Sequence, residues 1–260
     1  INKNKKKKID TRYKNRSIFY ESIDKMITNC KPSIISICVP PDQTLKVLKK
    51  IKNLNKYFIF LEKPIANNNS NLKKIYSLLK LSKNKIIVNY FRAWEKNNIN
   101  FIKIIKSRKK CTDVFVTFSK GLDSNASHII YMLISLFGKH NEIRIINKHK
   151  FTPSFLIYFK PNIKVIFNGI TDTKNNFCEA NFITDNGVYS FEAAGCRYTF
   201  QKFKKNIFYN NYYQISNHQK ILKEKELNIF GNISKKIYQN IILKSKNNIS
   251  NFETGIEVTN

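Results

Sequence analysis

Apolar residues in the first part of the chain fall into short runs that alternate with longer stretches of helical spacing. Three runs rich in β-branched and aromatic residues predict strands over 34–39, 57–61 and 85–90. Between them, apolar positions recur every three or four residues, which predicts helices over 45–54 and from about 69 to 79. Each strand–helix–strand unit has the size of a right-handed crossover, so this part predicts a parallel sheet.

After Trp94 the pattern changes, because most of the strands follow one another without helices between them. Helices are predicted over 99–105 and 125–137, on either side of a strand over 113–118. Turn signals then separate five further predicted strands, at 155–159, 163–167, 179–183, 188–191 and 197–203. Strands in direct succession indicate an antiparallel sheet. The tail is predicted to return to helix at 215–227 and 233–243.

The composition excludes several classes of protein. A chain of 260 residues with 42% hydrophobic content can bury one large core or two moderate ones, which excludes a disordered chain. The longest strongly apolar run, 129–137, is far shorter than the roughly 20 residues of a membrane-spanning helix. No early apolar stretch suits a signal peptide, so we predict a cytoplasmic protein with no membrane partner. Five cysteines without a CxxC pair and four histidines without ligand spacing predict neither a disulfide framework nor a metal site.

The formal charge of +30 raises the alternative of a nucleic-acid-binding protein. However, 41 of the 47 basic residues are lysine, and asparagine occurs 35 times. This joint enrichment is typical of A- and T-rich coding sequence, which distributes lysine over every solvated face. We therefore expect no specific nucleic-acid partner. A true nucleic-acid site would instead show an affinity that falls steeply with salt.

Candidate chemistry lies where the predicted strands end, because open parallel sheets bind ligands beyond the carboxyl ends of their strands. Pro40 ends the first strand, Glu62-Lys63-Pro64 follow the second, and Phe91-Arg92-Ala93-Trp94 follow the third. Further along, the helix at 125–137 is preceded by Lys120-Gly121 and opens with Asn125-Ala126-Ser127-His128. A lysine at a strand end can orient a substrate hydroxyl or take its proton, and histidine is suited to acid–base work. Without a wider motif, Lys63 could equally be an ordinary solvated lysine, and His128 could be a buried histidine of the core.

These motifs, in this order, resemble those of the glucose-fructose oxidoreductase, inositol dehydrogenase and rhizopine catabolism family (Gfo/Idh/MocA). The specific elements are Glu62-Lys63-Pro64 directly after a strand, and Lys120-Gly121 followed by an NxSH motif and a helix ending in Leu136-Phe137-Gly138. The resemblance covers nearly the whole chain. It implies α/β plus α+β architecture: an incomplete Rossmann-type parallel sheet over 1–91, then a substrate-binding and oligomerisation domain over 92–260 with a large, mainly antiparallel open sheet.

The resemblance also implies a function. Members of the family are NAD(P)-dependent oxidoreductases that act mostly on sugars and sugar derivatives. The NxSH branch suggests a sugar or sugar nucleotide of the kind used in surface polysaccharide synthesis. Lys63 and His128 would be the catalytic pair, reaching the sugar from different domains. NAD or NADP would be bound near Pro40, Glu62, Lys63, Pro64, Arg92 and Trp94, and the substrate by Lys120, Asn125 and Ser127.

A purely structural role remains an alternative for each pair of binding residues. A helix-capping role explains Asn125 and Ser127 equally well. An ordinary contact at the domain junction explains Arg92 and Trp94. Family members also use the broad face of the open sheet to associate, so we expect a homo-oligomer, a dimer or a tetramer.

The chain departs from the family pattern in three places. No glycine precedes Gly121, so the GxGxxG phosphate loop is missing, and we expect that a first βα unit is absent from this chain. Thr44 stands where relatives often have histidine. Tyr131 stands where an aspartate usually follows the catalytic histidine by three residues. These departures favour an alternative in which the protein is a catalytically degenerate relative that acts as a binding or assembly module.

Overall fold

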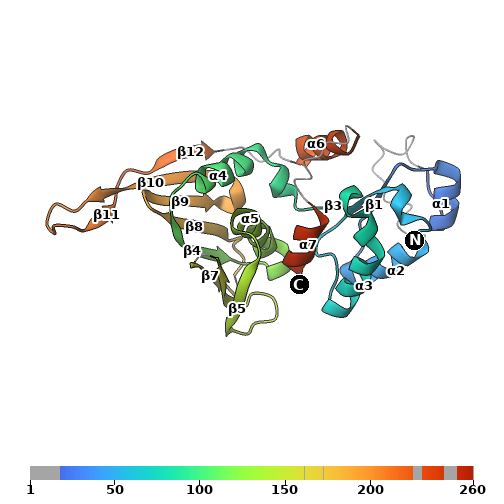
Figure 1. The fold of residues 1–260 in the computed structure, drawn as a ribbon, viewed down its shortest axis with the longest axis horizontal. Coiled ribbons are helices and arrows are strands. Elements are labelled where there is room, and N and C mark those ends of the chain that lie inside the picture. The colour runs from blue at the N-terminus through green and yellow to red at the C-terminus, as the bar shows by residue number, and fades with distance from the viewer. Residues whose placement is uncertain (1–17, 161, 172, 225–229, 243–250, 260) are drawn as a thin grey trace. The chain divides into compact units, whose positions relative to one another are not determined.

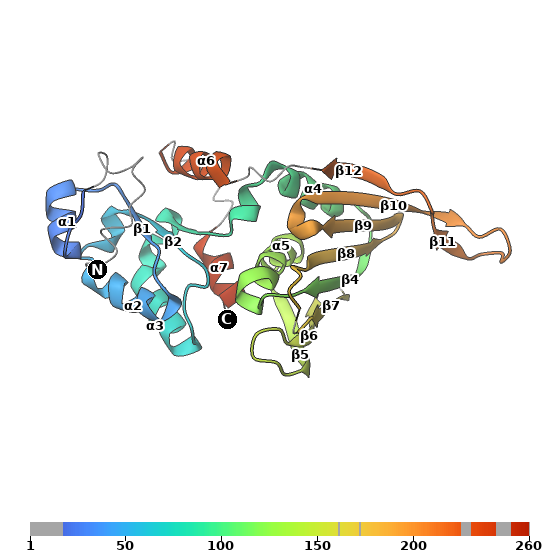
Figure 2. The same cartoon turned by 180° about the vertical axis from the view of Figure 1, so that it is seen from behind.

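The computed structural model describes residues 18–259, except 161, 172, 225–229 and 243–250. The chain divides into two compact units, Ile1–Val88 and Asn89–Asn260. The helices and strands of both units are labelled in Figure 1, and Figure 2 shows them from behind. None of the helices in the described part of the chain combines the length and the apolar character that spanning a bilayer requires.

The N-terminal unit is built on a small parallel sheet. Strands β1 (Ile34–Ile37), β2 (Phe58–Leu61) and β3 (Ile86–Val88) lie in the order β1-β2-β3, and both pairs are parallel. Helix α2 (Pro41–Lys50) follows β1 and helix α3 (Asn69–Leu79) follows β2, as the apolar spacing predicts. A further helix, α1 (Ile23–Cys30), precedes β1, and short 3₁₀ turns cover Leu54–Lys56 and Lys80–Lys85.

Local signals explain where these helices begin. Pro41 occupies the first turn of α2, where its missing N–H costs no hydrogen bond. Asn68 caps α3, because its side-chain oxygen accepts a hydrogen bond from the backbone N–H of Asn71 at 2.8 Å. Both helices begin shortly after a strand, α2 after β1 and α3 after β2, so the chain turns back across the sheet at these points.

The C-terminal unit contains a nine-stranded mixed sheet. Its order is β11-β10-β9-β8-β4-β7-β6-β5, and β12 also pairs with β10. All pairs are antiparallel except β4 with β7. The strands are β4 (Cys111–Phe118), β5 (His140–Asn147), β6 (Ser154–Phe159), β7 (Ile163–Gly169), β8 (Cys178–Thr184), β9 (Gly187–Glu192), β10 (Arg197–Lys205), β11 (Tyr213–Ile215) and β12 (Lys220–Glu224).

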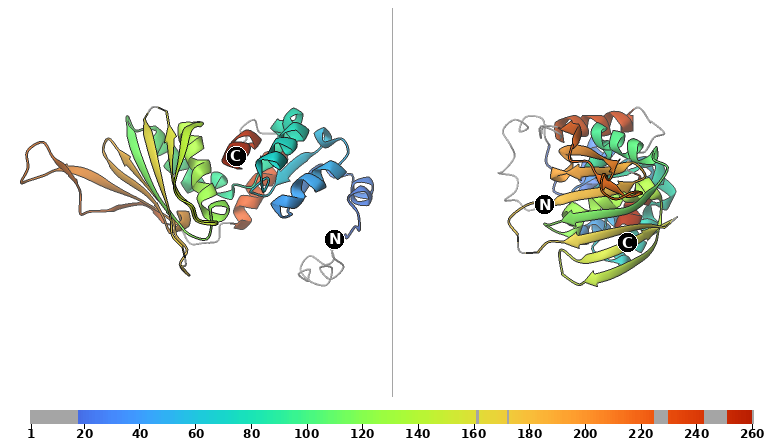
Figure 3. Two further views of the ribbon diagram at one scale, coloured as in Figure 1. Left: turned by 90° about the horizontal axis from the view of Figure 1, so that it is seen from below. Right: turned by 90° about the vertical axis from the view of Figure 1, so that its left-hand side faces the viewer.

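Helices cover one face of this sheet. Helix α4 (Lys96–Lys106) and helix α5 (Ser127–Phe137) pack Phe101, Ile105 and Met132 against inward-facing strand residues such as Val116 and Phe182. Alternate residues of the same strands point to the other face, where Phe115 is 45% exposed. The right-hand view of Figure 3 looks onto the sheet with the helices behind it. The unit ends with α6 (Phe230–Ile242) and α7 (Phe252–Thr259).

The predicted fold class is confirmed, including the small parallel sheet and the large, mainly antiparallel one. The helix predicted at 215–227 is wrong over 215–224, since this segment supplies the end of β11 and all of β12, both paired with β10, and 225–227 lie outside the described residues. The helix predicted at 233–243 is present as α6. Strand β5 was not predicted, although Ile143 and Ile145 alternate with polar residues in the way a strand requires.

Candidate functional site

The ends of β1 and β2 lie side by side at one edge of the N-terminal sheet. The backbone N–H of Glu62 donates to the carbonyl oxygen of Ile37 at 3.2 Å, which extends the ladder one residue past β2. Cys38, the next residue after Ile37, is close enough to Glu62 for its charge to act on the thiol. Burial first, and then the charge of Glu62, raise the pKa of Cys38. Two of the predicted cofactor positions, Pro40 and Glu62, therefore follow neighbouring strands at this edge.

Lys63 and Pro64 continue from Glu62 at the same edge. Both residues are half-buried, and the peptide bond between them is cis. Ile65 and Ala66 follow and are buried, so they anchor the segment to the core of the unit. Thr44, on α2, is also buried, with 4% of its surface exposed. It therefore packs within the unit rather than offering a side chain at its surface.

The described residues fit one part of a dinucleotide and not another. The carboxyl-end edge of a parallel sheet, with Pro40 and the Glu62-Lys63-Pro64 segment on it, is the position at which such folds hold a nicotinamide cofactor. A pyrophosphate cradle would need a glycine-rich turn, and no glycine occurs in the chain before Gly121. The fit therefore covers the edge at β1 and β2 and does not extend to the phosphates.

In the C-terminal unit, Arg92 and Trp94 lie on a 3₁₀ turn, η5 (Phe91–Trp94), directly before α4. The Arg92 guanidinium carbon lies 5.0 Å from the ring centre of Phe91 and 5.6 Å from that of Phe191. Gly195 makes this packing possible. Its φ is +84°, and a Cβ there would lie 2.6 Å from a terminal nitrogen of Arg92. Arg92 is thus clamped between two aromatic rings and a glycine.

A buried network holds η5 to the sheet. Glu95 caps α4, since its carboxylate accepts from the backbone N–H of Asn98 at 3.2 Å, and it also accepts from the Tyr198 hydroxyl at 3.0 Å. The Asn98 amide donates to the carbonyl oxygen of Arg92 at 3.1 Å. Burial, together with the nearby charge of Glu95, raises the pKa of Tyr198. These contacts give Arg92 and its neighbours a structural role within the unit.

The turn between β4 and α5 has an unusual backbone. Lys120 and Gly121 both have positive φ, at 63° and 106°, and the chain then forms a π-helical turn, η6 (Leu122–Ala126), before α5 begins. The backbone N–H of Leu122 donates to Phe151 of the β5–β6 loop at 2.7 Å. Strained residues and π-helical turns are concentrated at functional sites. This turn carries the NxSH motif.

His128 lies at the start of α5 in an aromatic pocket. Its side chain is buried, and its ring meets the rings of Phe91 and Tyr90 edge-on, with centres 4.7 Å and 5.9 Å away. Tyr131, one turn further along α5, stacks on Tyr90 at 4.5 Å. Burial raises the pKa of Tyr90. Tyr131 therefore packs on Tyr90, which is one of the two rings in contact with His128.

Three predicted substrate residues are bonded within the chain. The Asn125 amide donates to the carbonyl oxygen of Ser119 at 2.8 Å and to the side chain of Asn176 at 2.6 Å. The Lys120 ammonium donates to the carbonyl oxygen of Thr173 at 2.7 Å, and the Ser127 hydroxyl to that of Asp123 at 2.7 Å. Lys120 and Asn125 therefore hold the β7–β8 loop against the turn that precedes His128.

The β7–β8 loop is the element that sequence reasoning missed. It brings Thr173, Asn175 and Asn176 beside the NxSH turn, and Ser119 also bonds to it by donating to Asn175 at 2.8 Å and accepting from Phe177 at 2.8 Å. Its run of polar residues between two strands was the available signal. A cavity of about 340 Å³ adjoins the turn before α5, because Leu122 and Asp123 of η6 are among its lining residues. Ser127 lines this cavity together with isoleucines of α5, β5 and β6.

No metal centre is evident in the part of the chain that the structure describes, where no three His, Cys, Asp or Glu side chains are grouped to hold an ion. The predicted site residues thus form two sets, one in each unit. Pro40, Glu62, Lys63 and Pro64 share the edge of the N-terminal sheet. In the C-terminal unit, Lys120, Asn125, Ser127 and His128 share one turn, and Phe91 connects them to Arg92.

Comparison with known proteins yields a family match. Residues 1–90 match the sequence model GFO_IDH_MocA, described as an oxidoreductase family with an NAD-binding Rossmann fold. No curated protein sequence matches the chain.

Several solved structures share the fold. UDP-N-acetylglucosamine 3-dehydrogenase GnnA from Acidithiobacillus ferrooxidans aligns with 95% of this chain and 80% of its own, at 9% identity and a TM-score of 0.70. The aldose-aldose oxidoreductase from Caulobacter crescentus, complexed with glycerol, aligns with 92% of this chain and 78% of its own, at 13% identity and a TM-score of 0.72. An oxidoreductase from Agrobacterium radiobacter, in complex with NAD+, L-tartaric acid and magnesium, aligns with 92% of this chain and 78% of its own, at 10% identity and a TM-score of 0.65. At these identities the likeness shows the fold.

Proposed function

We propose that this chain is an NAD(P)-dependent dehydrogenase of a sugar or a sugar nucleotide, on the premise that its residues 1–90 match the Gfo/Idh/MocA model of NAD-binding oxidoreductases. The observation that carries the proposal is the NxSH turn, where a strained backbone and a π-helical turn lead into His128 and where Asn125 bonds to a loop rich in hydroxyl and amide groups. Such groups are suited to recognise the hydroxyls of a sugar. Two of the structurally similar proteins act on sugar compounds, GnnA on UDP-N-acetylglucosamine and the other on aldoses, by their names.

A nicotinamide bound there would supply the acceptor or donor of the hydride that leaves or enters the sugar carbon. The residues of this chain supply orientation and proton transfer. Lys63, at the carboxyl-end edge of the parallel sheet, orients the hydroxyl that is oxidised or takes its proton. His128 serves as an acid–base group, and the rings of Phe91 and Tyr90 fix its plane. Glu62 and Pro64 shape the edge on which the cofactor rests, and Pro40 borders it.

In the C-terminal unit, we assign Arg92 and Trp94 to the cofactor side of the site and Lys120, Asn125 and Ser127 to the substrate side. The bonds of Lys120 and Asn125 within the chain suggest that they act mainly by fixing the β7–β8 loop. Asn175 and Asn176 of that loop are exposed and add hydrogen-bonding groups beside the turn. A role in surface polysaccharide synthesis, a cytoplasmic location and a homo-oligomer of two or four copies complete the proposal.

A second candidate function is a catalytically degenerate relative that binds or assembles without turnover. Tyr131 favours it, because the stacked ring replaces a carboxylate that positions substrate in relatives. The two candidates differ in whether a bound cofactor is ever reduced.

Protection of Cys38 tests the cofactor site without relying on turnover. Cys38 lies beside Glu62 at the edge where we place the cofactor, and Cys30, in the same unit, is also exposed. We expect NAD+ or NADP+ to slow the alkylation of Cys38 several-fold and to leave Cys30 unchanged. Mass spectrometry of peptides from the full chain measures both rates in one sample. Equal alkylation rates at Cys38 with and without saturating dinucleotide would contradict a cofactor site at this edge.

A further inference from the structure

A hairpin of two strands extends from one end of the C-terminal sheet. The first six residues of β10 pair with β9, whereas its last three, Phe203 to Lys205, pair only with β11 in the described part of the unit. Figure 1 shows β10 and β11 projecting beyond the other strands, and the left-hand view of Figure 3 shows the same projection from below. We call residues 203–215 the arm, and residues 206–212, between its strands, the tip.

The tip exposes large apolar side chains and carries no charge. Ile207 and Phe208 are each 82% exposed, and the tyrosines are about as open, at 67% for Tyr209, 69% for Tyr212 and 70% for Tyr213 directly after the tip. The other residues of the tip are asparagines. Five such side chains within seven positions form a patch of the kind that marks an interaction site. The arm therefore presents an uncharged, largely apolar end to its surroundings.

The backbone of the tip is already bonded within the arm. The side-chain oxygen of Asn206 accepts from the backbone N–H groups of Phe208 and Tyr209, at 2.8 and 2.9 Å. The backbone N–H of Asn206 donates to the carbonyl oxygen of Tyr212 at 2.8 Å, and its side-chain amide donates to Gln214 at 2.6 Å. An unbonded backbone N–H is costly where water is scarce. These bonds lower the cost of placing the tip in an apolar layer.

Lysines surround the base of the arm on both of its faces. Lys204 pairs with Gln214 and Lys205 with Tyr213, so these adjacent lysines point to opposite faces of the hairpin. Lys202 shares the face of Lys204, and all three lysines are exposed. No carboxylate of the described residues forms an ion pair with any of them. We call these three lysines the collar. The arm is thus divided along its length, and both of its faces carry lysine.

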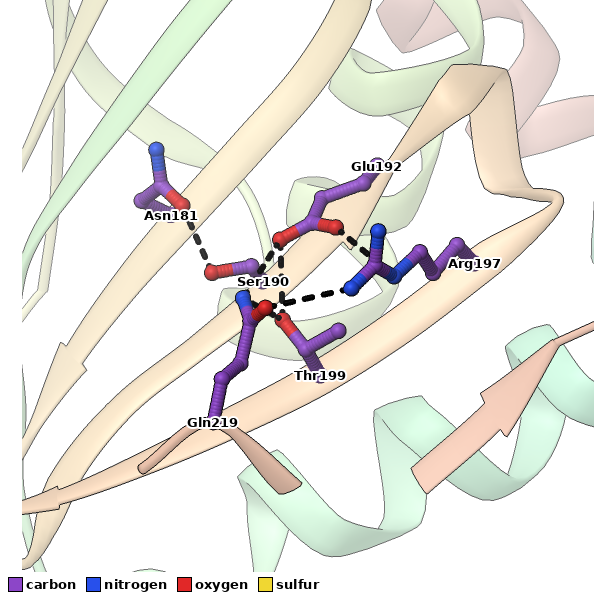
Figure 4. A network of polar contacts seen from close by, with 6 residues as sticks. All are labelled: Asn181, Ser190, Glu192, Arg197, Thr199 and Gln219. Carbon is purple, nitrogen blue, oxygen red and sulfur yellow. Dashed lines mark hydrogen bonds and ion pairs between the residues drawn. The ribbon is translucent and has the colours of Figure 1, made fainter. Parts of the chain in front are cut away.

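No acidic residue offsets the collar. Residues 193–223 contain six lysines and arginines and no aspartate or glutamate. Glu192, the nearest carboxylate before the arm in the sequence, is paired with Arg197 at 3.4 Å. It also accepts from Thr199 at 2.8 Å and from Gln219 at 3.2 Å, in the network that Figure 4 shows. Because this carboxylate is already neutralised, the lysines beyond it keep their full charge.

The lengthwise order of the arm discriminates between partners. A protein surface laid along either face would bury Lys204 or Lys205, without a carboxylate from the arm to pair with it. A nucleic acid needs cations beside the rings on which its bases stack, and the tip carries none. An anionic lipid surface suits both parts at once, because the acyl boundary accepts the apolar tip while the phosphates attract the collar just behind it. Tyrosine is typical of the layer between the two.

We propose that the arm docks tip-first on a membrane surface that contains anionic lipids, with the tip at the boundary of head groups and acyl chains and the collar among the lipid phosphates. The contact is peripheral and requires no spanning segment. It departs from the expectation of no membrane partner, which considered only spanning segments and signal peptides. The inference goes beyond the proposed function and does not depend on it, so its failure would leave the dehydrogenase intact.

Co-sedimentation of the protein with vesicles measures the contribution of the tip. Phosphatidylcholine vesicles with about one third phosphatidylglycerol present the anionic surface, and pure phosphatidylcholine is the neutral reference. F208S with Y209S removes two apolar side chains of the tip and keeps its length. L81S is the matched control, because Leu81 is 91% exposed and lies in the N-terminal unit. We expect the tip variant to bind anionic vesicles about tenfold or more weakly than wild type, and L81S to bind like wild type, with unchanged circular dichroism in both.

The same assay measures the contribution of the collar. K204S with K205S removes two of its lysines, and K73S with K74S removes two exposed lysines of α3 as the control for total charge. We expect the collar variant to bind anionic vesicles about tenfold or more weakly at low salt, and the α3 variant to bind nearly as wild type does. Equal effects of the two lysine pairs would overturn the collar.

A chain with a formal charge of +30 can adsorb to anionic lipid through charge alone, so the tip needs a readout of its own. F208W places an indole there, and the wild type, whose single tryptophan is the buried Trp94, gives the background. We expect the emission of F208W to shift to the blue on anionic vesicles and to be quenched by brominated acyl chains, with no change in wild type.

Several outcomes would overturn the proposal. Binding of F208S with Y209S at the level of L81S would do so, as would an F208W emission that brominated lipid leaves unchanged. If the tip variant kept its vesicle binding but lost self-association in sedimentation velocity, the tip would belong to a protein interface. If it kept its vesicle binding but lost a salt-dependent affinity for a fluorescent oligonucleotide, the tip would belong to a nucleic-acid site.

Discussion

Replacement of His128 by glutamine is expected to lower kcat by about 10²- to 10⁴-fold, because it removes the acid–base group while leaving the fold of α5 intact. The side chain is buried against Phe91 and Tyr90, so part of any loss could come from disturbed packing. His128→Phe separates the two causes, since it keeps an aromatic ring in the pocket and lacks a titratable nitrogen. Steady-state kinetics of both variants with the best substrate give the comparison.

We expect the dinucleotide to protect Cys38 from alkylation in both His128 variants as it does in the wild type, because Cys38 lies in the N-terminal unit and His128 in the C-terminal unit. The pH profile of kcat/KM should lose the limb that His128 contributes. His218→Gln is the matched control, since His218 is exposed and remote from the NxSH turn in the sequence. Wild-type turnover in His128→Phe would contradict the assignment of His128 and leave it as a packing residue of α5.

Replacement of Lys63 by alanine is expected to have an effect of the same order, about 10²- to 10⁴-fold on kcat, through loss of the group that orients or deprotonates the substrate hydroxyl. Lys63 is half-buried between Glu62 and Pro64 at the strand-end edge. Lys63→Arg keeps the charge but changes the geometry, so it should also be slow. Rate measurements with added methylamine probe whether a free amine restores part of the lost turnover.

Lys73→Ala provides the control for charge, because Lys73 is an exposed lysine on α3 of the same unit. It should retain full activity. Rescue of Lys63→Ala by methylamine would identify proton transfer as the role of Lys63. A slow variant that methylamine does not rescue would indicate that Lys63 orients the substrate hydroxyl instead. If Lys63→Ala turned over like Lys73→Ala, Lys63 would be an ordinary surface residue.

The fold could be predicted where apolar spacing was regular. Ile35 and Ile37 on β1, and Leu72, Ile75 and Leu79 on α3, are buried as their periodicity predicts. The segment at 215–227 was misread because its apolar residues suit a helical spacing, whereas its structure is decided by pairing with β10. Such pairing joins residues distant in sequence, and local spacing carries no sign of it. The parallel pairing of β4 with β7 was hidden for the same reason.

The candidate site could be located in part. The NxSH motif indicated the turn before α5, and the structure brings Lys120, Asn125, Ser127 and His128 together there. The aromatic packing of His128 against Phe91 and the bonds from Asn125 to the β7–β8 loop could not be predicted, because they join residues 37 and 51 positions apart in the sequence. Neither polarity nor spacing within one segment specifies which distant loop it meets.

Transfer of hydride to the nicotinamide is the most direct test of the central claim that the protein is an NAD(P)-dependent sugar dehydrogenase. The protein is incubated with NAD+ or NADP+ and a panel of perdeuterated UDP-sugars and aldoses, and the dinucleotide is analysed by mass spectrometry. The account predicts a reduced cofactor that carries one deuterium from the sugar, formed with wild type and strongly reduced in Lys63→Ala. Protection of Cys38 by the dinucleotide, with no deuterated cofactor from any sugar, would contradict it and favour the binding module.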